Sequence, residues 1–149
     1  MNALAAAGGG FLLAVLWFDL MFDVQTLAHR EPQLPEEMLA SIASYYRRVT
    51  TTARPMNRLI ALAMLTTIVA LVLEIVDHDG PLWVRWASLA IAIPPIGLAA
   101  MRTVPSAVRL GTRCDSAQQQ SEIARSICRQ HIFCATAIAA LLVLQLTLA

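Results

Sequence analysis

The 149-residue sequence contains little charge and no lysine. Charged residues make up 14% of the chain, whereas hydrophobic residues make up 58% and the mean hydropathy is +0.62. Soluble domains carry about a quarter charged residues, so this composition excludes an ordinary soluble protein. All eleven cationic residues are arginine, a usage typical of GC-rich bacterial genomes. We therefore expect a bacterial membrane protein.

Cysteine and histidine are also scarce, with three residues of each. The cysteines form no CxxC pair, which argues against a disulfide-forming quinone enzyme. A haem held between two histidines is also disfavoured, because His29 lies in a connection and His78 lies at the opposite membrane face from His131. Cys128, His131 and Cys134 do not have the spacing of a zinc site. The sequence therefore predicts no metal site and identifies no cofactor.

Four apolar runs are long enough to cross the ~30 Å hydrocarbon core of a bilayer, which takes about 20 residues. They cover approximately residues 4–24, 56–76, 82–101 and 127–148. The first run lacks the basic segment of a signal peptide, so we expect it to be retained. The remaining residues form two longer connections and a turn, which are too short for another domain. The sequence predicts an all-α, four-helix transmembrane bundle, with residues 1–149 as a single domain.

The distribution of arginine predicts the orientation of this bundle. Ten arginines lie in or beside the two long connections, and only Arg85 lies on the opposite side. Cytoplasmic loops carry the excess of Lys and Arg in membrane proteins. We therefore expect a multi-pass protein of the cytoplasmic (inner) membrane, with both long connections in the cytoplasm and both termini outside.

The segment "PQLPEEMLASIASYYRRV", residues 32–49, has the features of an amphipathic helix between the first two spans. Pro35 precedes two acidic residues, and a pair of arginines follows at the other end, which matches the helix dipole. Its apolar residues recur at three- and four-residue spacing. This helix either lies in the headgroup region with Tyr45 and Tyr46 at the interface, or covers the cytoplasmic end of the bundle.

Prolines and glycines mark two places where the spans should depart from regular packing. The third span contains "IPPIG" at residues 93–97, which predicts a kink that faces the bundle interior. The first span contains Gly8, Gly9 and Gly10, which allow another helix to approach closely. That helix could be the second span, the fourth span or part of another subunit.

Asp19 and Asp23 lie four residues apart near the cytoplasmic end of the first span, and therefore on one helix face. The predicted topology brings further polar residues to the same depth, namely Asn57, Arg58, Arg102, Cys128, Arg129, His131 and Cys134. Charges at membrane depth cost at least ~2.5–3.5 kcal/mol each, and they usually pair or mark a functional site. The sequence therefore predicts a polar site at this end of the bundle.

These residues support more than one role. We expect Asp19, Asp23 and His131 to act as the catalytic proton donors and acceptors of a cytosol-accessible pocket. The polar residues Asn57, Arg58, Arg102 and Arg129 would bind the substrate. The alternative is an ion-pair latch, in which a carboxylate meets an arginine and holds the helices together. A metal bound by the two carboxylates and the histidine is a less favoured possibility.

The layout of the chain resembles that of a known family. The motifs "YYRRVTTTARPMNRL" before the second span and "RTVPSAVRLG" after the third are similar to those of small bacterial four-helix membrane proteins of the anthrone-oxygenase-like family. This chain has "VPSAVRL" where that family would have a proline followed by an asparagine. The resemblance implies a lipophilic aromatic or quinone-like substrate that is reached from the bilayer.

The sequence is compatible with different classes of function. One is a protein that binds or oxidises a lipophilic small molecule. Another is a non-enzymatic structural or accessory subunit of a membrane complex. A less favoured third is a small proton-coupled transporter that uses Asp19 as its carrier. The expected partners are membrane lipids, such a small molecule, and either further copies of the chain or other subunits, with no indication of nucleic acid.

Overall fold

The computed structural model describes residues 2–78 and 80–148, and helix is the only regular structure in these ranges. The long helices are joined by short 3₁₀ or π segments, and several of these continue a neighbouring helix without a break. The elements are α1 (Asn2–Asp23), the 3₁₀ segment η1 (Val24–Ala28), α2 (Glu36–Arg47), the π segment η2 (Arg48–Thr52), α3 (Arg54–Val76), α4 (Leu82–Leu98), the π segment η3 (Ala99–Thr103), α5 (Val104–Thr112) and α6 (Ala117–Thr147).

Four helical segments among the described residues are long and apolar enough to span a membrane, which confirms the predicted fold class. They are Ala3–Ala28, Pro55–Val76, Leu82–Thr112 and Ala117–Thr147. The third segment is longer than expected, because the helix continues from α4 through η3 into α5 instead of ending near residue 101. The fourth helix, α6, begins at Ala117, well before its apolar run, so its first turns project beyond the membrane core.

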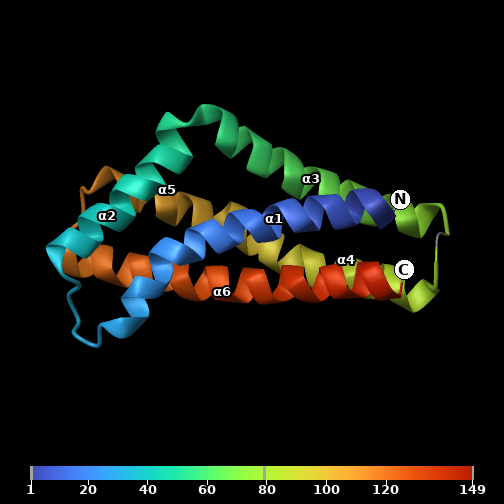
Figure 1. Ribbon diagram of the computed structural model, residues 1–149. Helices are drawn as coiled ribbons and strands as arrows, with labels where there is room; N and C mark the ends of the chain where they lie inside the picture. The colour runs from blue at the N-terminus through green and yellow to red at the C-terminus, as the bar shows by residue number, and fades with distance from the viewer. Residues whose placement is uncertain (1, 79, 149) are drawn as a thin grey trace.

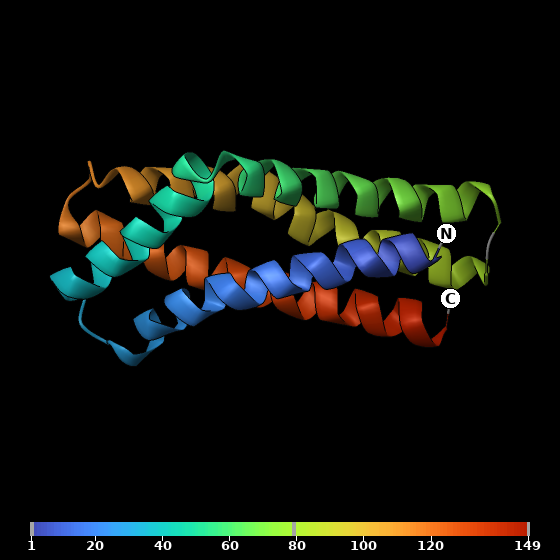
Figure 2. The ribbon, with the colours of Figure 1, turned by 45° about the horizontal axis from the view of Figure 1, so that its top comes forward.

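The spans form an antiparallel bundle in which α1 and α4 each pack between α3 and α6. Both ends of the described chain lie beside the α3–α4 turn, and the two long connections lie at the opposite end (Figure 1). Figure 2 shows the same arrangement from a second direction. The bundle therefore has a terminal end and a connection end, and the arginine-rich segments gather at the connection end.

Small residues of α1 allow close contact with both neighbouring helices. A Cβ added at Gly8 would lie 2.3 Å from Thr67 Oγ1 on α3, and one added at Gly9 would lie 3.2 Å from Leu142 Cδ2 on α6. A Cβ at Gly10 would meet nothing within 4 Å. The glycine run therefore brings α1 close to the second and fourth spans, an alternative that the sequence had left open.

The amphipathic helix α2 covers the connection end of the bundle, so we call it the cap helix. It packs mainly against α5, with further contacts to α6. Its buried face supplies Leu39, Ile42, Ala43 and Tyr46 to an apolar core shared with α5 and α6. A Cβ added at Gly111 of α5 would lie only 3.0 Å from the backbone nitrogen of Arg47, so the two helices cross almost in backbone contact.

A second apolar core lies within the membrane bundle itself. It is built by α1, α3, α4 and α6 and includes Ala5, Leu12, Ala70, Leu71, Ala92, Ile138 and Leu141. Pro95 is buried where α4 approaches η3, and its carbonyl oxygen accepts a hydrogen bond from Cys134 Sγ at 3.5 Å. Pro95 thus faces the bundle interior, as the sequence predicted for this break, whereas Pro94 is exposed on the outer surface of α4.

Candidate functional site

A polar cluster lies at the junction of the membrane bundle and the cap helix. Asp19 and Asp23 come from the last turns of α1, Tyr45 and Tyr46 from the end of the cap helix, and His131 from the middle of α6. We call these five residues the Asp–His–Tyr cluster. Tyr46 belongs to the apolar core under the cap, so the cluster joins that core to the membrane bundle.

Hydrogen bonds connect the members of the cluster across three helices. Tyr45 donates to Asp19 Oδ1 and Tyr46 donates to Asp23 Oδ1, each at 2.7 Å. The second oxygen of Asp23 lies 2.6 Å from His131 Nδ1. His131 Nε2 lies 3.8 Å from Asp19 Oδ2, a distance too long for a direct hydrogen bond. Both carboxylates are thus held on one oxygen by a tyrosine, but only Asp23 is hydrogen-bonded directly to the imidazole.

The two carboxylates and the imidazole are buried, so they depend on these hydrogen bonds for stabilisation. Asp23 is fully buried, and Asp19 and His131 are only 8% and 6% exposed. A charged group taken out of water is very costly unless it is paired and hydrogen-bonded. The two tyrosine hydroxyls supply such bonds to the carboxylates. Burial, followed by the neighbouring Asp23 and Asp19 charges, raises the pKa of Tyr46, so its hydroxyl remains a donor at physiological pH.

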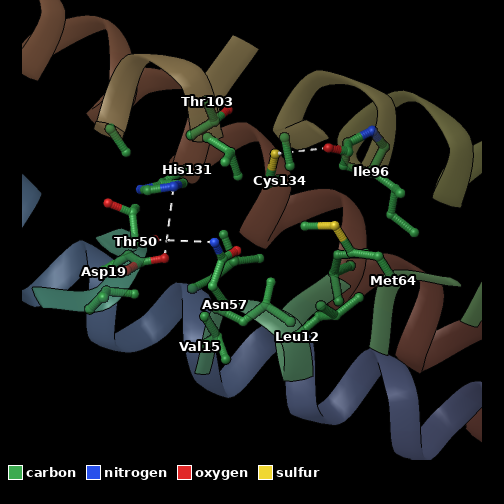
Figure 3. Close-up of a pocket in the computed structure, with 18 of the residues that line it drawn as sticks. Leu12, Val15, Asp19, Thr50, Asn57, Met64, Ile96, Thr103, His131 and Cys134 are labelled. Atoms are coloured by element: carbon green, nitrogen blue, oxygen red, sulfur yellow. Dashed lines mark hydrogen bonds and ion pairs between the residues drawn. The ribbon is translucent and has the colours of Figure 1, made fainter. Parts of the chain in front are cut away.

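A cavity of about 90 Å³ adjoins the cluster within the bundle. Asp19 and His131 line one part of it together with the polar side chains of Thr50, Asn57 and Thr103 (Figure 3). The rest of the wall is apolar and is supplied mainly by the four spans, including Leu12, Val15, Leu16, Ile60, Met64, Ile96, Cys134 and Ile138. The space is therefore amphipathic, with its polar residues gathered near the cap helix.

Two of the segments that line the cavity are π-helical. Thr50 belongs to η2, which follows the cap helix, and Thr103 belongs to η3, which joins α4 to α5. π turns widen a helix locally and are frequent at functional sites. Thr50 donates to the Tyr46 carbonyl at 2.7 Å, and Asn57 donates to the Thr50 carbonyl at 3.2 Å. These bonds tie the π segment η2 to the end of the cap helix and to the start of α3.

The structure brings together only part of the predicted site. Asp19, Asp23 and His131 meet, and Asn57 lines the cavity beside them. The three arginines that we expected at the site do not join it, because Arg58, Arg102 and Arg129 are all exposed. Among the described side chains, the ion-pair partner of both carboxylates is His131 rather than an arginine. A long arginine side chain near the membrane boundary can extend its charged group to water, so it need not turn inward.

Sequence reasoning missed the two tyrosines. One of the two alternatives for this helix placed them at the membrane interface, and neither assigned them to the polar site, but they turn toward the bundle and hydrogen-bond to the carboxylates. The available signal was that Tyr46 falls on the same face of the cap helix as Leu39 and Ile42, which are buried. A tyrosine on the buried face of a helix needs a partner for its hydroxyl, and an aspartate at the same depth supplies one.

The cluster does not have the geometry of a metal centre. Its two carboxylates approach opposite nitrogens of the imidazole, so the three groups do not converge on one point where an ion would lie. Within residues 2–78 and 80–148, no three His, Cys, Asp or Glu side chains are grouped to hold a metal ion.

A separate polar contact joins the spans near the terminal end. Gln145 Nε2 on α6 donates to Glu74 Oε2 on α3 at 3.1 Å and to Ser88 Oγ on α4 at 2.9 Å. Glu74 lies near the end of α3, close to the α3–α4 turn, but it is only 1% exposed. Its hydrogen bond to Gln145 ties the second span to the fourth.

Comparison with known proteins decides the family. Residues 2–149 match the Shr3 chaperone family, which is described as ER membrane protein SH3. The chain belongs to this family. Neither the curated proteins nor the solved structures contain a match to this member of the Shr3 family.

Family membership corrects two of our predictions. The resemblance to the anthrone-oxygenase-like family is wrong, because its short motifs only reflect arginines and prolines at the ends of membrane helices. Such residues recur at the ends of many unrelated spans. The expected bacterial inner membrane also conflicts with the match, since this is a eukaryotic family of the ER membrane. The all-arginine composition therefore does not indicate a bacterial source.

Proposed function

We propose that this protein is a non-enzymatic accessory protein of the ER membrane that assists the folding or assembly of other membrane proteins. The observation that carries the proposal is the match of the Shr3 chaperone family to residues 2–149. The fold is compatible with this role, because the described chain consists of a membrane bundle with a short cap. A partner would therefore meet mainly an intramembrane surface.

The outer surface of the bundle suits contact with transmembrane helices. Only 22–33% of the residues in the apolar window of each span are buried inside the described structure. On α1, the exposed side chains near the cluster include Trp17, Phe18 and Met21. Helices associate in lipid by van der Waals packing, and methionine adapts to partners of different shape. We propose that this face of α1 contacts the spans of an incompletely assembled membrane protein.

The arginine distribution supports an orientation for the proposed accessory protein. Ten of the eleven arginines lie at or beside the connection end. If the positive-inside rule holds in the ER membrane, the cap helix faces the cytosol and both termini face the lumen. An accessory protein in this orientation would present its cap helix on the side where new membrane proteins are synthesised.

Site-specific photocrosslinking tests the accessory role. A photoreactive residue at Phe18, which is 60% exposed, should crosslink to transmembrane segments of multi-pass proteins. The same group at the buried Leu71 is the matched control and should give only crosslinks within the chain. Deletion of the protein should also leave these same multi-pass proteins in the ER. Capture of lipid alone at Phe18, with unchanged export of multi-pass proteins on deletion, would contradict the proposal.

A second candidate function is small-molecule binding in the cavity beside Asp19 and His131. It is favoured by one observation, namely that an amphipathic space adjoins a histidine nitrogen and a carboxylate oxygen that are not bonded to each other. A cavity of roughly 150 Å³ is known to enclose benzene. The space here is about 90 Å³, so its ligand would be smaller than the quinone-like or aromatic molecule that we had expected.

Native mass spectrometry of the protein in lipid nanodiscs tests this second function. A retained small molecule should be seen with the parent protein and lost when the cavity is filled by Ala99→Leu, since Ala99 lines the wall. Identical spectra for the two proteins would argue against a bound ligand.

A further inference from the structure

We propose that the cavity binds a primary alkylammonium group, with the ammonium at Asp19 and His131 and a short alkyl chain along the apolar wall. This inference rests on the second candidate function above, because it requires that the cavity admits a ligand. It is independent of the accessory role. A primary ammonium on a short alkyl chain occurs in two natural ligands, a small free amine and the ethanolamine headgroup of a membrane lipid.

The hydrogen-bond acceptors of the Asp–His–Tyr cluster match an ammonium group. An ionised Asp23, 2.6 Å from His131 Nδ1, requires the proton on Nδ1. In the neutral ring, Nε2 is then an acceptor. Asp19 Oδ2 is also an acceptor, and the two atoms lie 3.8 Å apart. Two acceptors at this separation do not bond to each other, but one donor group can bond to both. An ammonium has three donors and no acceptor.

The charge of the cluster also favours a cationic ligand. The cluster contains two buried carboxyl groups, each of which accepts a hydrogen bond from a tyrosine hydroxyl. Among the described side chains, their only ion-pair partner is His131. With both groups ionised, the cluster would keep a net negative charge inside the bundle even beside a charged imidazolium. A bound water would satisfy the acceptors but would leave this charge in place, whereas an ammonium neutralises it.

The remaining space has the size and polarity of a short alkyl chain. Leu12 and Val15 of α1, Met64 of α3 and Ile96 of α4 surround the part of the cavity away from the cluster (Figure 3). By proportion with the ~150 Å³ cavity that holds benzene, a volume of 90 Å³ accommodates about four non-hydrogen atoms. This is the size of n-propylamine. A trimethylammonium headgroup does not fit, because it is too bulky at the nitrogen for this volume and has no N–H to donate to Asp19 and His131.

The test compares n-propylamine with n-propanol, which has the same number of non-hydrogen atoms but no charge. The protein is placed in nanodiscs of phosphatidylcholine, and its thermal unfolding is followed as each probe is added. We expect n-propylamine to raise the Tm and n-propanol to have little effect. Asp19→Asn should weaken amine binding by at least about tenfold, because it removes the charged acceptor. A second set of nanodiscs that contain phosphatidylethanolamine shows whether a lipid headgroup is the source.

A cavity-filling variant keeps the test decisive if Asp19→Asn does not fold. Ala99→Leu fills the space without altering the Asp–His–Tyr cluster, and Ala100→Leu is its control, because Ala100 is exposed and does not line the cavity. We expect only Ala99→Leu to abolish the stabilisation by amine or by phosphatidylethanolamine. Equal stabilisation by n-propanol and n-propylamine would remove the ammonium class and leave small-molecule binding intact. A response to neither probe and neither lipid, or one that persists in Ala99→Leu, would overturn the inference.

Discussion

Removal of the Tyr46 hydroxyl is the most direct probe of the Asp–His–Tyr cluster. Tyr46→Phe keeps the buried ring but deletes the donor that lies 2.7 Å from Asp23 Oδ1. Because Asp23 is fully buried, water cannot easily replace this bond. Hydrogen bonds to charged groups contribute about 1.5–3 kcal/mol, so we expect the free energy of unfolding to fall by about that amount. Reversible unfolding in mixed micelles, followed by circular dichroism, measures the change.

Tyr45→Phe is the matched control. Its hydroxyl makes a bond of the same length to Asp19, but Asp19 borders the cavity and Tyr45 is half-buried, so solvent can compensate. The remaining ring still stacks on Phe22 with centroids 4.1 Å apart. We expect a loss of about 0.5–1.5 kcal/mol. A larger loss for Tyr45→Phe than for Tyr46→Phe would refute the reasoning from burial. In combination with Asp23→Asn, Tyr46→Phe should cost less than the sum of the single changes, because the two residues share one bond.

The remaining predictions concern packing and orientation. Gly8→Ala should lower the free energy of unfolding by about 1–3 kcal/mol, because the new methyl group would meet α3, whereas Gly10→Ala should be close to neutral in the same assay. Gly111→Ala should destabilise the attachment of the cap helix to a similar extent, measured as faster proteolysis of the connections, and Gly97→Ala, which meets nothing within 4 Å, should not. Cys114 is exposed and the other cysteines are buried, so a membrane-impermeant maleimide should label sealed ER vesicles from the cytosolic side, and Cys114→Ser should abolish the signal. Labelling that requires permeabilised vesicles would reverse the proposed orientation.

The sequence predicted the fold well because a bilayer imposes strong local requirements. A span needs about 20 apolar residues wherever it occurs, and this requirement can be read without knowledge of its neighbours. The amphipathic pattern of residues 32–49 likewise predicted a helix, and α2 covers Glu36–Arg47 of this segment. The prediction of residues 82–101 covered only the apolar run of the third span, since polar residues from Arg102 onward hid a helix that continues to Thr112. Apolar composition alone does not mark the end of a helix that projects beyond the membrane core.

The candidate site was predictable only in part. Asp19, Asp23 and His131 could be placed together, because alternating spans return to the same membrane depth. Their partners could not be chosen, since arginines and tyrosines were all available near that depth. Tyrosine supplies a donor without a charge and can stay inside an apolar core, whereas a guanidinium is better solvated at the boundary. The sequence contains both types and does not rank them.

The sequence by itself determined that this chain crosses a membrane four times, that its arginines gather at one end, and that an amphipathic helix joins the first two spans. These properties depend on the transfer of single segments between water and lipid, and such transfer is a local property. Only the tertiary structure decided that Tyr46 reaches Asp23, that the cap helix crosses Gly111, and that a cavity remains beside His131. These features depend on how several helices pack at once, and packing at atomic distances is not encoded in any one segment.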